Sequence, residues 1–428
     1  MSEAEQQGVY FGIDIGEKST LVSYYQLNMP EPDTVSTVMG SEVYTMPTML
    51  ARRSDGNQWY IGHEAKQMIS LGKATAADQL FIRAIQDADI VIDGEKFTAR
   101  ELLYIYIRKL LEAPGRFYNQ APLEKLVFTV DNTDANVAEM FSMVAGRLEL
   151  NSTQWMVIDH RQAFYYYAFS QEEQRGPKRN IMLYDFEDRR MHSCLLTHST
   201  STTPYVVNME NINQGDIMTD KDKAFLDIAM KTLPTSDAGV IYLTGDGFDG
   251  QWLKESLQYI CDNRRVFMGK NLYSKGACYA GAVRDGKRPW NYIYVGDQEM
   301  KMSISLKVIS ENKPYLYSMI TAGDSWYNAR GEVEVILDGK AEVAFHIQPP
   351  NRHDASIETV ELTDMPLRPT RTTRLRISAV PVSDRSVRMT IKDLGFGEIY
   401  KSSGLSWNYD ITLPDADSVS DAMKELGR

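Results

Sequence analysis

The sequence constrains the fold most strongly through a pattern that it contains twice. Two alternating apolar runs joined by a short polar turn fill residues 9–25, and residues 178–196 have the same strand–turn–strand form. Each hairpin precedes a buried strand, a polar turn and an amphipathic helix, at 125–144 and at 240–260. The repeat predicts two similar α/β halves that face one another. A cleft between such halves is a natural ligand site.

One helix outside the repeat is also well marked. In the stretch FTARELLYIYIRKLL, Thr98 lies three residues before Glu101, which is the spacing of a capping box. Phe97 and Leu102 are spaced as a hydrophobic staple. Apolar residues then recur on one face at helical spacing. We therefore expect a helix over about 98–111.

The pattern changes after about residue 290, where short alternating runs replace the alternation of strands and helices. The change follows residues 285–289, a polar stretch with two chain breakers. We expect a hairpin over 333–347 with a two-residue turn at Asp338 and Gly339. A second strand pair is expected over 374–394. These runs predict a small antiparallel sandwich.

The expected domain organisation follows from this change. An α/β domain would cover residues 1–290, with halves at about 8–150 and 178–290, and an all-β sandwich would cover 291–412. Residues 413–428 would form a short C-terminal helix or tail. In a chain of 428 residues, both larger domains are long enough to bury a core of their own.

Charge and composition exclude several classes of partner. The formal net charge of −12 argues against nucleic acid, because phosphate binding needs a cationic surface. No apolar run is long enough to span a bilayer, so no membrane partner is expected. The first residues are acidic and polar, unlike a secretory signal, and three cysteines do not make a disulfide framework. These features favour a cytoplasmic protein and leave its oligomeric state open.

Several motifs, in this order, resemble the DnaK family of heat-shock chaperones, within the actin and sugar-kinase ATPase superfamily. GIDIGEKST (12–20) resembles the first phosphate loop of the family, and NIMLYDFEDRRMHSCLL (180–196) falls at the place of the second. VIYLTGDGFDGQ (240–251) resembles the adenosine-binding turn, and NLYSKGACYAGAV (271–283) the helix that closes that half. Residues 291–412 resemble the peptide-binding β-domain. The resemblance implies a bacterial-type protein with an α/β actin-like ATPase domain, a duplicated ribonuclease H-like fold, followed by an all-β sandwich.

The resemblance also implies a site for ATP or ADP with Mg²⁺. Its nucleotide-binding residues would be Gly12, Asp14, Gly16, Glu17, Lys18, Ser19, Asp185, Gly245, Asp246, Gly247 and Tyr273. Asp14 and Asp185 would hold the Mg²⁺, which prefers one or two carboxylates plus phosphate oxygens. Glycine in a hairpin turn lets backbone N–H groups approach a phosphate closely.

The second loop departs from the family pattern. Where the family has three glycines and a threonine, this chain has Glu187, Asp188, Arg189 and Arg190. A carboxylate about 4 Å from a phosphate costs on the order of 4 kcal/mol at an effective dielectric near 20. His160 stands where the family has its catalytic glutamate, so we assign no catalytic residue. Weak or lost nucleotide binding, with little or no hydrolysis, is therefore expected.

Other readings of these motifs stay open. An ordinary hairpin turn is the alternative to a phosphate loop at residues 16–19. His192, Cys194 and His198 suggest a metal site, but no fourth ligand is apparent and structural roles are expected. The stretch GDGFDG (245–250) lacks the spacing of an EF-hand, so a turn with a helix cap is expected there. FYYYAF (164–169) is expected to be packed core.

The function expected from these features is that of a divergent chaperone-like protein that binds a protein or peptide partner. One alternative is an active ATP-dependent chaperone or ATPase, in which Arg189 or Arg190 replaces the lost backbone contacts. Another is a structural scaffold or assembly subunit whose cleft is closed by side chains.

Overall fold

The computed structural model describes residues 8–37, 43–112, 121–172, 179–199, 203–296, 298–310, 312–327, 329–350 and 355–414. The chain divides into two compact units. The first comprises Met1–Thr197 with Met209–Trp290, and the second comprises His198–Asn208 with Asn291–Arg428. Across the described ranges, no helix combines the length and the apolar character needed to cross a membrane.

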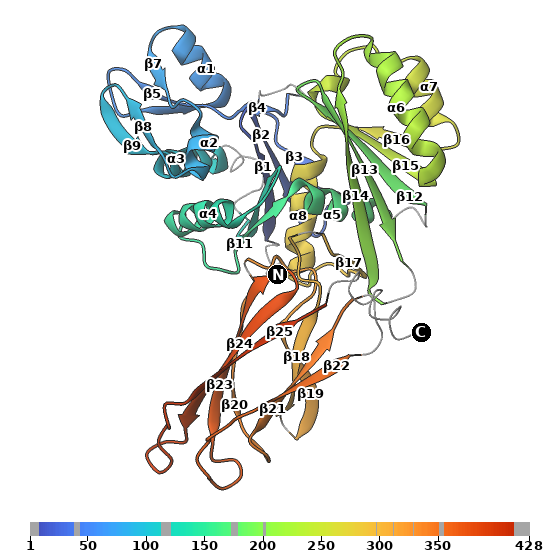
Figure 1. The fold of residues 1–428 in the computed structure, drawn as a ribbon. Coiled ribbons are helices and arrows are strands. Elements are labelled where there is room, and N and C mark those ends of the chain that lie inside the picture. The colour runs from blue at the N-terminus through green and yellow to red at the C-terminus, as the bar shows by residue number, and fades with distance from the viewer. Residues whose placement is uncertain are drawn as a thin grey trace, which may run out of the picture. The chain divides into compact units, whose positions relative to one another are not determined.

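Two sheets in the first unit share one strand order (Figure 1). The first sheet runs β3 (Asp33–Thr34), β2 (Ser19–Tyr25), β1 (Val9–Ile15), β10 (Leu123–Val130) and β11 (Trp155–Asp159). The second runs β14 (Tyr205–Asp216), β13 (Arg190–His198), β12 (Asn180–Glu187), β15 (Ala238–Thr244) and β16 (Arg265–Met268). In both, an antiparallel hairpin precedes a strand that pairs in parallel with its first strand, and a further parallel strand pairs with that one.

The helices follow the same repeat. In the first half they are α3 (Ala99–Glu112), α4 (Ala135–Arg147) and α5 (His160–Glu172), and in the second α6 (Lys221–Ser236), α7 (Glu255–Cys261) and α8 (Leu272–Arg284). Each half therefore contains, in chain order, three strands, a helix, a strand, a second helix, a last strand and a third helix. The expected helix over 98–111 is confirmed as α3, and the N–H of Glu101 donates to Thr98 Oγ1 at 3.3 Å.

The first half carries an insertion between β3 and α3. It contains a small sheet of β5 (Leu50–Arg53), β6 (Trp59–Ile61) and β7 (Ala74–Ala76). Two helices, α1 (Gly62–Ser70) and α2 (Leu80–Ile85), and a hairpin of β8 (Asp89–Ile92) with β9 (Glu95–Thr98) complete it. A short strand, β4 (Met46–Pro47), leads into the insertion and pairs with β2.

Helices α5 and α8 cross at very short range in the centre of the first unit. A Cβ placed on Gly276 of α8 would lie 1.9 Å from the carbonyl oxygen of Ala163 in α5. A Cβ on Gly12 of β1 would lie 2.0 Å from the carbonyl oxygen of Ser274 in α8. Glycine at these two positions therefore lets α8 lie directly against both α5 and β1.

Aromatic side chains fill the space around this crossing. Phe164, Tyr165, Tyr166 and Phe169 of α5 are all buried, which confirms the expectation that this stretch is packed core. Trp290 Nε1 donates to the hydroxyl of buried Tyr165 at 2.5 Å, which gives both polar groups a partner.

The second unit is built from two four-stranded sheets that enclose one core. One sheet runs β19 (Lys313–Ile320), β18 (Ser303–Ser310), β21 (Glu342–Gln348) and β22 (Ser356–Glu361). The other runs β20 (Gly331–Ile336), β23 (Arg374–Ser383), β24 (Ser386–Gly395) and β25 (Ser406–Thr412). A short strand, β17 (Tyr292–Tyr294), pairs in parallel with the start of β14 within this unit.

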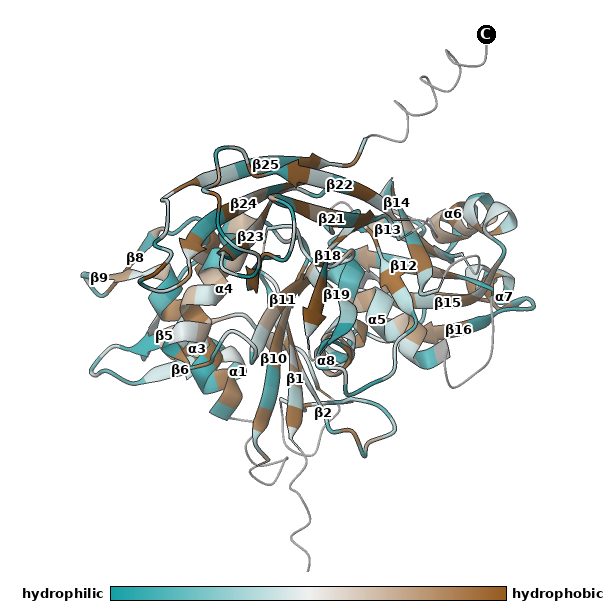
Figure 2. Ribbon diagram, turned by 90° about the horizontal axis from the view of Figure 1, so that it is seen from below, coloured by the Kyte–Doolittle hydropathy of each residue, from teal (hydrophilic) through white to brown (hydrophobic). Residues whose placement is uncertain are grey.

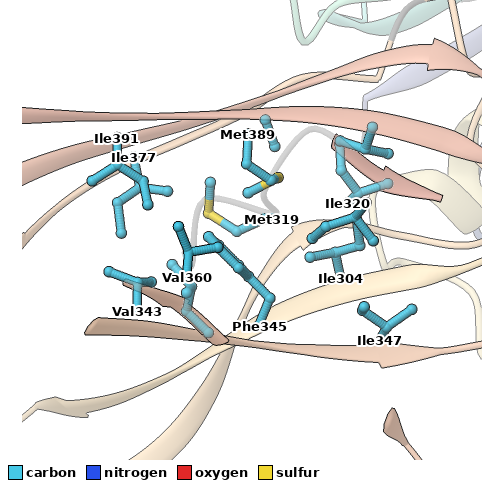
Figure 3. Packing of buried hydrophobic residues seen from close by; sticks show 14 of the residues in the cluster. Ile304, Met319, Ile320, Val343, Phe345, Ile347, Val360, Ile377, Met389 and Ile391 are labelled. Atoms are coloured by element: carbon cyan, nitrogen blue, oxygen red, sulfur yellow. The ribbon is translucent and has the colours of Figure 1, made fainter. Parts of the chain in front are cut away.

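Side chains from both sheets meet in the sandwich core. Ile377, Met389 and Ile391 from one sheet face Ile304 and Phe345 from the other (Figure 3). Hydrophobic and hydrophilic residues alternate along β24, as Figure 2 shows, because successive side chains of a strand point to opposite faces. This alternation leaves the outer face of the sheet polar.

One expected strand pair is confirmed and the other is wrong. β23 and β24 pair around the turn at Ser383 and Ser386, as expected. The hairpin expected over 333–347 is absent, since β20 pairs with β23 while β21 pairs with β18 and β22. Alternation shows which face of a strand meets the core but not which strand lies beside it. The segment 337–341 passes from one sheet of the sandwich to the other.

The C-terminal helix or tail expected over 413–428 falls almost wholly outside the described residues, which end at 414.

Replacing Gly276 by Ala tests the close crossing of α5 and α8. The added Cβ has no space against the Ala163 carbonyl, so we expect a loss of about 1–3 kcal/mol in the free energy of unfolding. Gly146 of α4 is the matched control, since a Cβ there meets nothing within 4 Å. Gly146→Ala should leave stability unchanged or raise it by up to about 1 kcal/mol. Urea unfolding measures the free energy of unfolding of both variants. Equal changes in the two variants would contradict the close crossing of α5 and α8.

Candidate functional site

The site begins with a carboxylate and an imidazole at one edge of the first sheet. Asp14 lies near the end of β1, and His160 is the first residue of α5, directly after β11. Because β1, β10 and β11 are parallel, their carboxyl ends meet at the same edge. His160 Nε2 lies 2.8 Å from Asp14 Oδ1, and Asp14 is only 8% exposed.

This contact determines the charge of His160. Burial alone would lower the pKa of His160, but the Asp14 carboxylate outweighs it and raises that pKa to about 9. The charges of Asp131 and Asp185 act in the same direction. At neutral pH His160 is therefore an imidazolium that donates a charge-assisted hydrogen bond to Asp14.

A second carboxylate faces this pair from the other half of the unit. The rings of His160 and Tyr273 are stacked, with centroids 3.9 Å apart and planes 2° from parallel. Tyr273, on α8, donates its hydroxyl to Asp185 Oδ2 on β12 at 2.7 Å. The four side chains Asp14, His160, Tyr273 and Asp185 form a continuous contact between the halves, which we call the carboxylate bridge.

The Asp185 end of the bridge lies in a poorly solvated place. Its Oδ1 atom is buried and accepts no hydrogen bond from any residue that the structure describes. Burial raises the pKa of Asp185, although the Tyr273 hydroxyl opposes the rise. Burial and the nearby Asp185 charge also raise the pKa of Glu187. Added negative charge is therefore unfavourable at this end.

The two hairpin turns above the bridge are joined to each other. Lys18 Nζ forms an ion pair with the carboxylate of Asp188 in the facing turn. The N–H of Gly16 donates to the Ser19 carbonyl at 2.9 Å, and that of Asp188 donates to Asp246 Oδ1 at 3.3 Å. Two backbone donors of these turns are thus already used within the protein.

The glycines assigned to nucleotide binding have close protein neighbours. Gly12 lies beneath α8, as described above. A Cβ on Gly245 would meet the carbonyl oxygen of Phe186 at 2.3 Å, and a Cβ on Gly247 would meet the Phe186 ring at 2.3 Å. Trp252 Nε1 and Lys221 Nζ both donate to the Gly247 carbonyl. These glycines allow close packing of protein on protein.

The side chains as arranged do not fit Mg-ATP. Asp14 faces an imidazolium rather than an open position, and Tyr273 covers Asp185. The second turn places Asp188 and Arg189 at φ 49° and 71°, a two-residue turn without the glycines that a phosphate cradle needs. Arg190 lies 3.8 Å from Asp216, so its charge is directed to that carboxylate.

The other assigned residues are distributed around the turns. Glu17 and Lys18 are exposed at the tip of the first turn, and Ser19 begins β2. Asp246 is exposed and begins a short 3₁₀ turn, not a calcium loop. No group of three His, Cys, Asp or Glu side chains able to hold a metal occurs in the described part of the chain, which includes His192, Cys194 and His198.

The structure thus brings together Asp14, Lys18, Asp185, Asp246 and Tyr273, whereas Gly12 and Gly247 beside them pack against protein neighbours. The sequence reasoning did not recognise His160 and Asp188 as partners of this group. One signal was available, because His160 directly follows a strand parallel to β1. The neighbouring Asp159 points elsewhere and caps α5 by accepting from the Gln162 N–H at 2.8 Å.

Comparison with protein-family models gives two matches. A model described as "Family of unknown function (DUF5716) C-terminal" matches residues 31–297, which is more than half of the chain. A model described as "Domain of unknown function (DUF8552)" matches residues 299–413. No curated protein matches the chain.

Replacing Asp14 by Asn tests the charge assignment in the bridge. We expect the His160 pKa to fall from about 9 by roughly 2 units or more, toward its ordinary value, because its main anionic partner is lost. NMR titration of labelled histidines measures this pKa. Asp33→Asn is a matched control, since Asp33 interacts with Tyr24 and not with His160. A His160 pKa that is the same in Asp14→Asn and in the wild type would contradict the assignment.

The same pair predicts how stability depends on pH. Because the folded-state pKa of His160 lies above its unfolded value of about 6.5, the pair stabilises the fold fully below about pH 6.5. This contribution is lost as pH rises through about 9. The stability difference between wild type and Asp14→Asn, measured by urea unfolding across this range, should shrink with rising pH. A difference that stays constant would contradict the prediction.

Proposed function

We propose that this chain, which belongs to the DUF5716 C-terminal family of unknown function, is a chaperone-like binding protein on an actin-like ATPase fold that no longer uses nucleotide. In this proposal its partner is a protein or peptide segment, and the second unit binds it. The protein would be bacterial in type and act in the cytoplasm without enzyme activity.

The repeated sheets support the proposed ancestry. An actin-like ATPase domain is a duplication of one strand order, and both sheets of the first unit have the same order. The two hairpin turns, at residues 16–18 and 188–189, occupy equivalent positions in the two halves. Ancestral phosphate loops would be expected at these positions.

The carboxylate bridge is the observation that carries the proposed loss of nucleotide use. Phosphoryl transfer depends on positioned metal ions and charges, which requires carboxylates that face a metal. Here one carboxylate faces an imidazolium and the other a tyrosine hydroxyl. Binding of Mg-ATP would require the stacked rings to separate and the ion pair between Lys18 and Asp188 to break.

An edge of the sandwich supports the proposed partner class. Strand β19 is the edge strand of its sheet, and its Tyr315 and Leu316 are 47% and 55% exposed. An exposed edge offers backbone donors and acceptors to an added strand, and apolar side chains beside it add contact area. In this proposal the peptide adds as a strand at this edge.

A structural scaffold or assembly subunit is the second candidate. The carboxylate bridge favours it too, because a closed cleft needs no ligand to remain rigid. Light scattering separates the candidates: a stable oligomer of the 48.6-kDa chain favours the scaffold, and a monomer favours the binding protein.

Thermal unfolding with and without Mg-ATP tests the proposed loss of nucleotide use. Mg-ATP at about 100 times the Kd of a site would stabilise the folded protein by about 2.7 kcal/mol. We expect no shift in Tm at about 1 mM Mg-ATP, because the bridge and the joined turns occupy the place of the phosphates. A rise in Tm that disappears in Asp14→Asn would show that the site is used and would favour the active ATPase.

A further inference from the structure

One strand of the second sheet has a long edge without a neighbouring strand. β14 has twelve residues and lies beside β13 on one side. On its other side, β17 pairs only with the first three, Tyr205–Val207. No strand in the described part of the chain pairs there with the remaining nine, residues 208–216, which we call the open edge. Backbone N–H and C=O groups of such an edge are available to an added strand.

The middle of the open edge is uncovered on both faces of the sheet as well. Residues 210–213 are all exposed, and Ile212 is 43% exposed. Successive side chains of a strand point to opposite faces, so neither face is covered by a helix or a second sheet at this place. An added strand can therefore pair with this edge without displacing another element.

The open edge has none of the features that usually protect an edge strand. Natural edges are kept short, or carry lysine or proline, which block pairing with other chains. Residues 208–216 contain no Lys, Arg or Pro. The other outer strands of the two large sheets are shorter: β3 has two residues, β17 three, β16 four and β11 five. The open edge is thus the place in these sheets that best accepts a strand.

The position of Ile212 favours a second copy of this chain as the source of that strand. Ile212 is the middle residue of the nine and the one large apolar side chain among them that is exposed. When two identical strands pair antiparallel about their middle residue, that residue lies opposite itself. The two Ile212 side chains would then pack against each other, as β-branched pairs do across neighbouring strands.

The charges of the open edge agree with this register. Pairing about Ile212 places Glu210 of each copy opposite Gln214 of the other, so no like charges meet. Pairing about Asn213 would instead place Glu210 opposite Asp216, two carboxylates. The whole chain has a formal charge of −12, so two copies repel one another over most of their surface. A contact along the open edge brings few of these charges together.

The extent of the pairing is limited at both ends of the open edge. β17 occupies the edge as far as Val207. At the other end Gly215 has φ 91°, and its N–H donates to Asn213 Oδ1 at 2.9 Å within the same strand. Regular pairing therefore centres on residues 210–214 of each copy. So short a contact fits a weak dimer that dissociates on dilution.

We propose that the open edge pairs with the open edge of a second copy, antiparallel about Ile212, and forms a two-fold symmetric dimer. The second sheets of the two copies then become one continuous sheet. A two-fold contact of this kind uses the same surface on both copies and closes without further growth. The inference goes beyond the proposed function, which assigns peptide binding to the second unit, and the weak dimer differs from the stable oligomer of a scaffold.

Cysteine cross-linking tests the register. The background is Cys261→Ser, since Cys261 is exposed. In Ile212→Cys the two opposed Cα atoms would lie about 4.5–5.5 Å apart, within the range of a disulfide. We expect a dimer on a non-reducing gel after mild oxidation with copper phenanthroline. Gln214→Cys should not cross-link to itself, because its two copies would be about 14 Å apart along the strands. Val91→Cys is the control for random collision, since Val91 is 65% exposed on β8.

A charge exchange at Ile212 tests the contact in solution. Ile212→Lys places two ammonium groups beside each other, so the Kd of the dimer, measured by sedimentation, should rise about tenfold or more. Ile212→Glu should weaken the dimer similarly, and an equimolar mixture of the two variants should restore it. Val91→Lys adds the same charge elsewhere and should dimerise as wild type. Thermal unfolding like that of wild type shows that each variant is folded.

The outcomes decide between this dimer and its alternatives. A wild type that stays monomeric at about 100 μM, with no cross-link in Ile212→Cys, overturns the inference. Cross-linking of Gln214→Cys or Val91→Cys as strong as that of Ile212→Cys overturns it as well. If the wild type is monomeric and Ile212→Lys weakens its binding of a leucine-containing peptide, the edge takes a strand of another protein, which also overturns it. Failure of the dimer leaves the proposed peptide binding by the second unit standing.

Discussion

The stacked contact between His160 and Tyr273 is the interaction on which the interpretation of the first unit depends. Two carboxylates that face one another in a poorly solvated space repel unless something neutralises or separates them. Here an imidazolium neutralises Asp14, and a phenol hydroxyl satisfies one oxygen of Asp185. The rings stack at 3.9 Å, so they also fill the space between the two acids. The halves of the unit are therefore joined by their own side chains.

The packing of α8 makes this contact possible. Gly276 brings α8 against α5, and Gly12 brings β1 against α8, so Tyr273 and His160 come from helices that touch each other. Larger residues at these glycines would move α8 away from both neighbours. The same close crossing that fixes the core thus positions the two rings. Fold and site in this protein share one set of contacts.

Local features of the fold followed from the sequence, and contacts between distant segments did not. The capping residues of α3 and the turn at Ser383–Ser386 lie within a few positions of their partners, so spacing alone indicated them. β20 and β21 each alternate well, yet they belong to opposite sheets, and alternation carries no information about the neighbouring strand. This is why the expected hairpin was wrong.

In the candidate site, too, the sequence indicated individual residues but not the contacts between them. Asp14 and Asp185 were selected by their motifs, and the structure brings both to one place. Tyr273 was assigned to the same site through its motif, and His160 stood at the place of the family's catalytic glutamate, but no sequence signal indicated that the two rings stack between the acids. The ion pair between Arg368 and Asp393 was not predicted either, since Arg368 lies on the connection between β22 and β23 and Asp393 on β24, with no sequence signal that pairs them.

A crystal structure of the chain grown with Mg²⁺ and a non-hydrolysable ATP analogue tests the central claim most directly. We expect the rings of His160 and Tyr273 to remain stacked, with Lys18 still paired to Asp188 and no nucleotide between the turns. An ordered triphosphate between Gly16 and Asp188, with the rings apart and Asp14 and Asp185 turned toward a metal, would contradict the account.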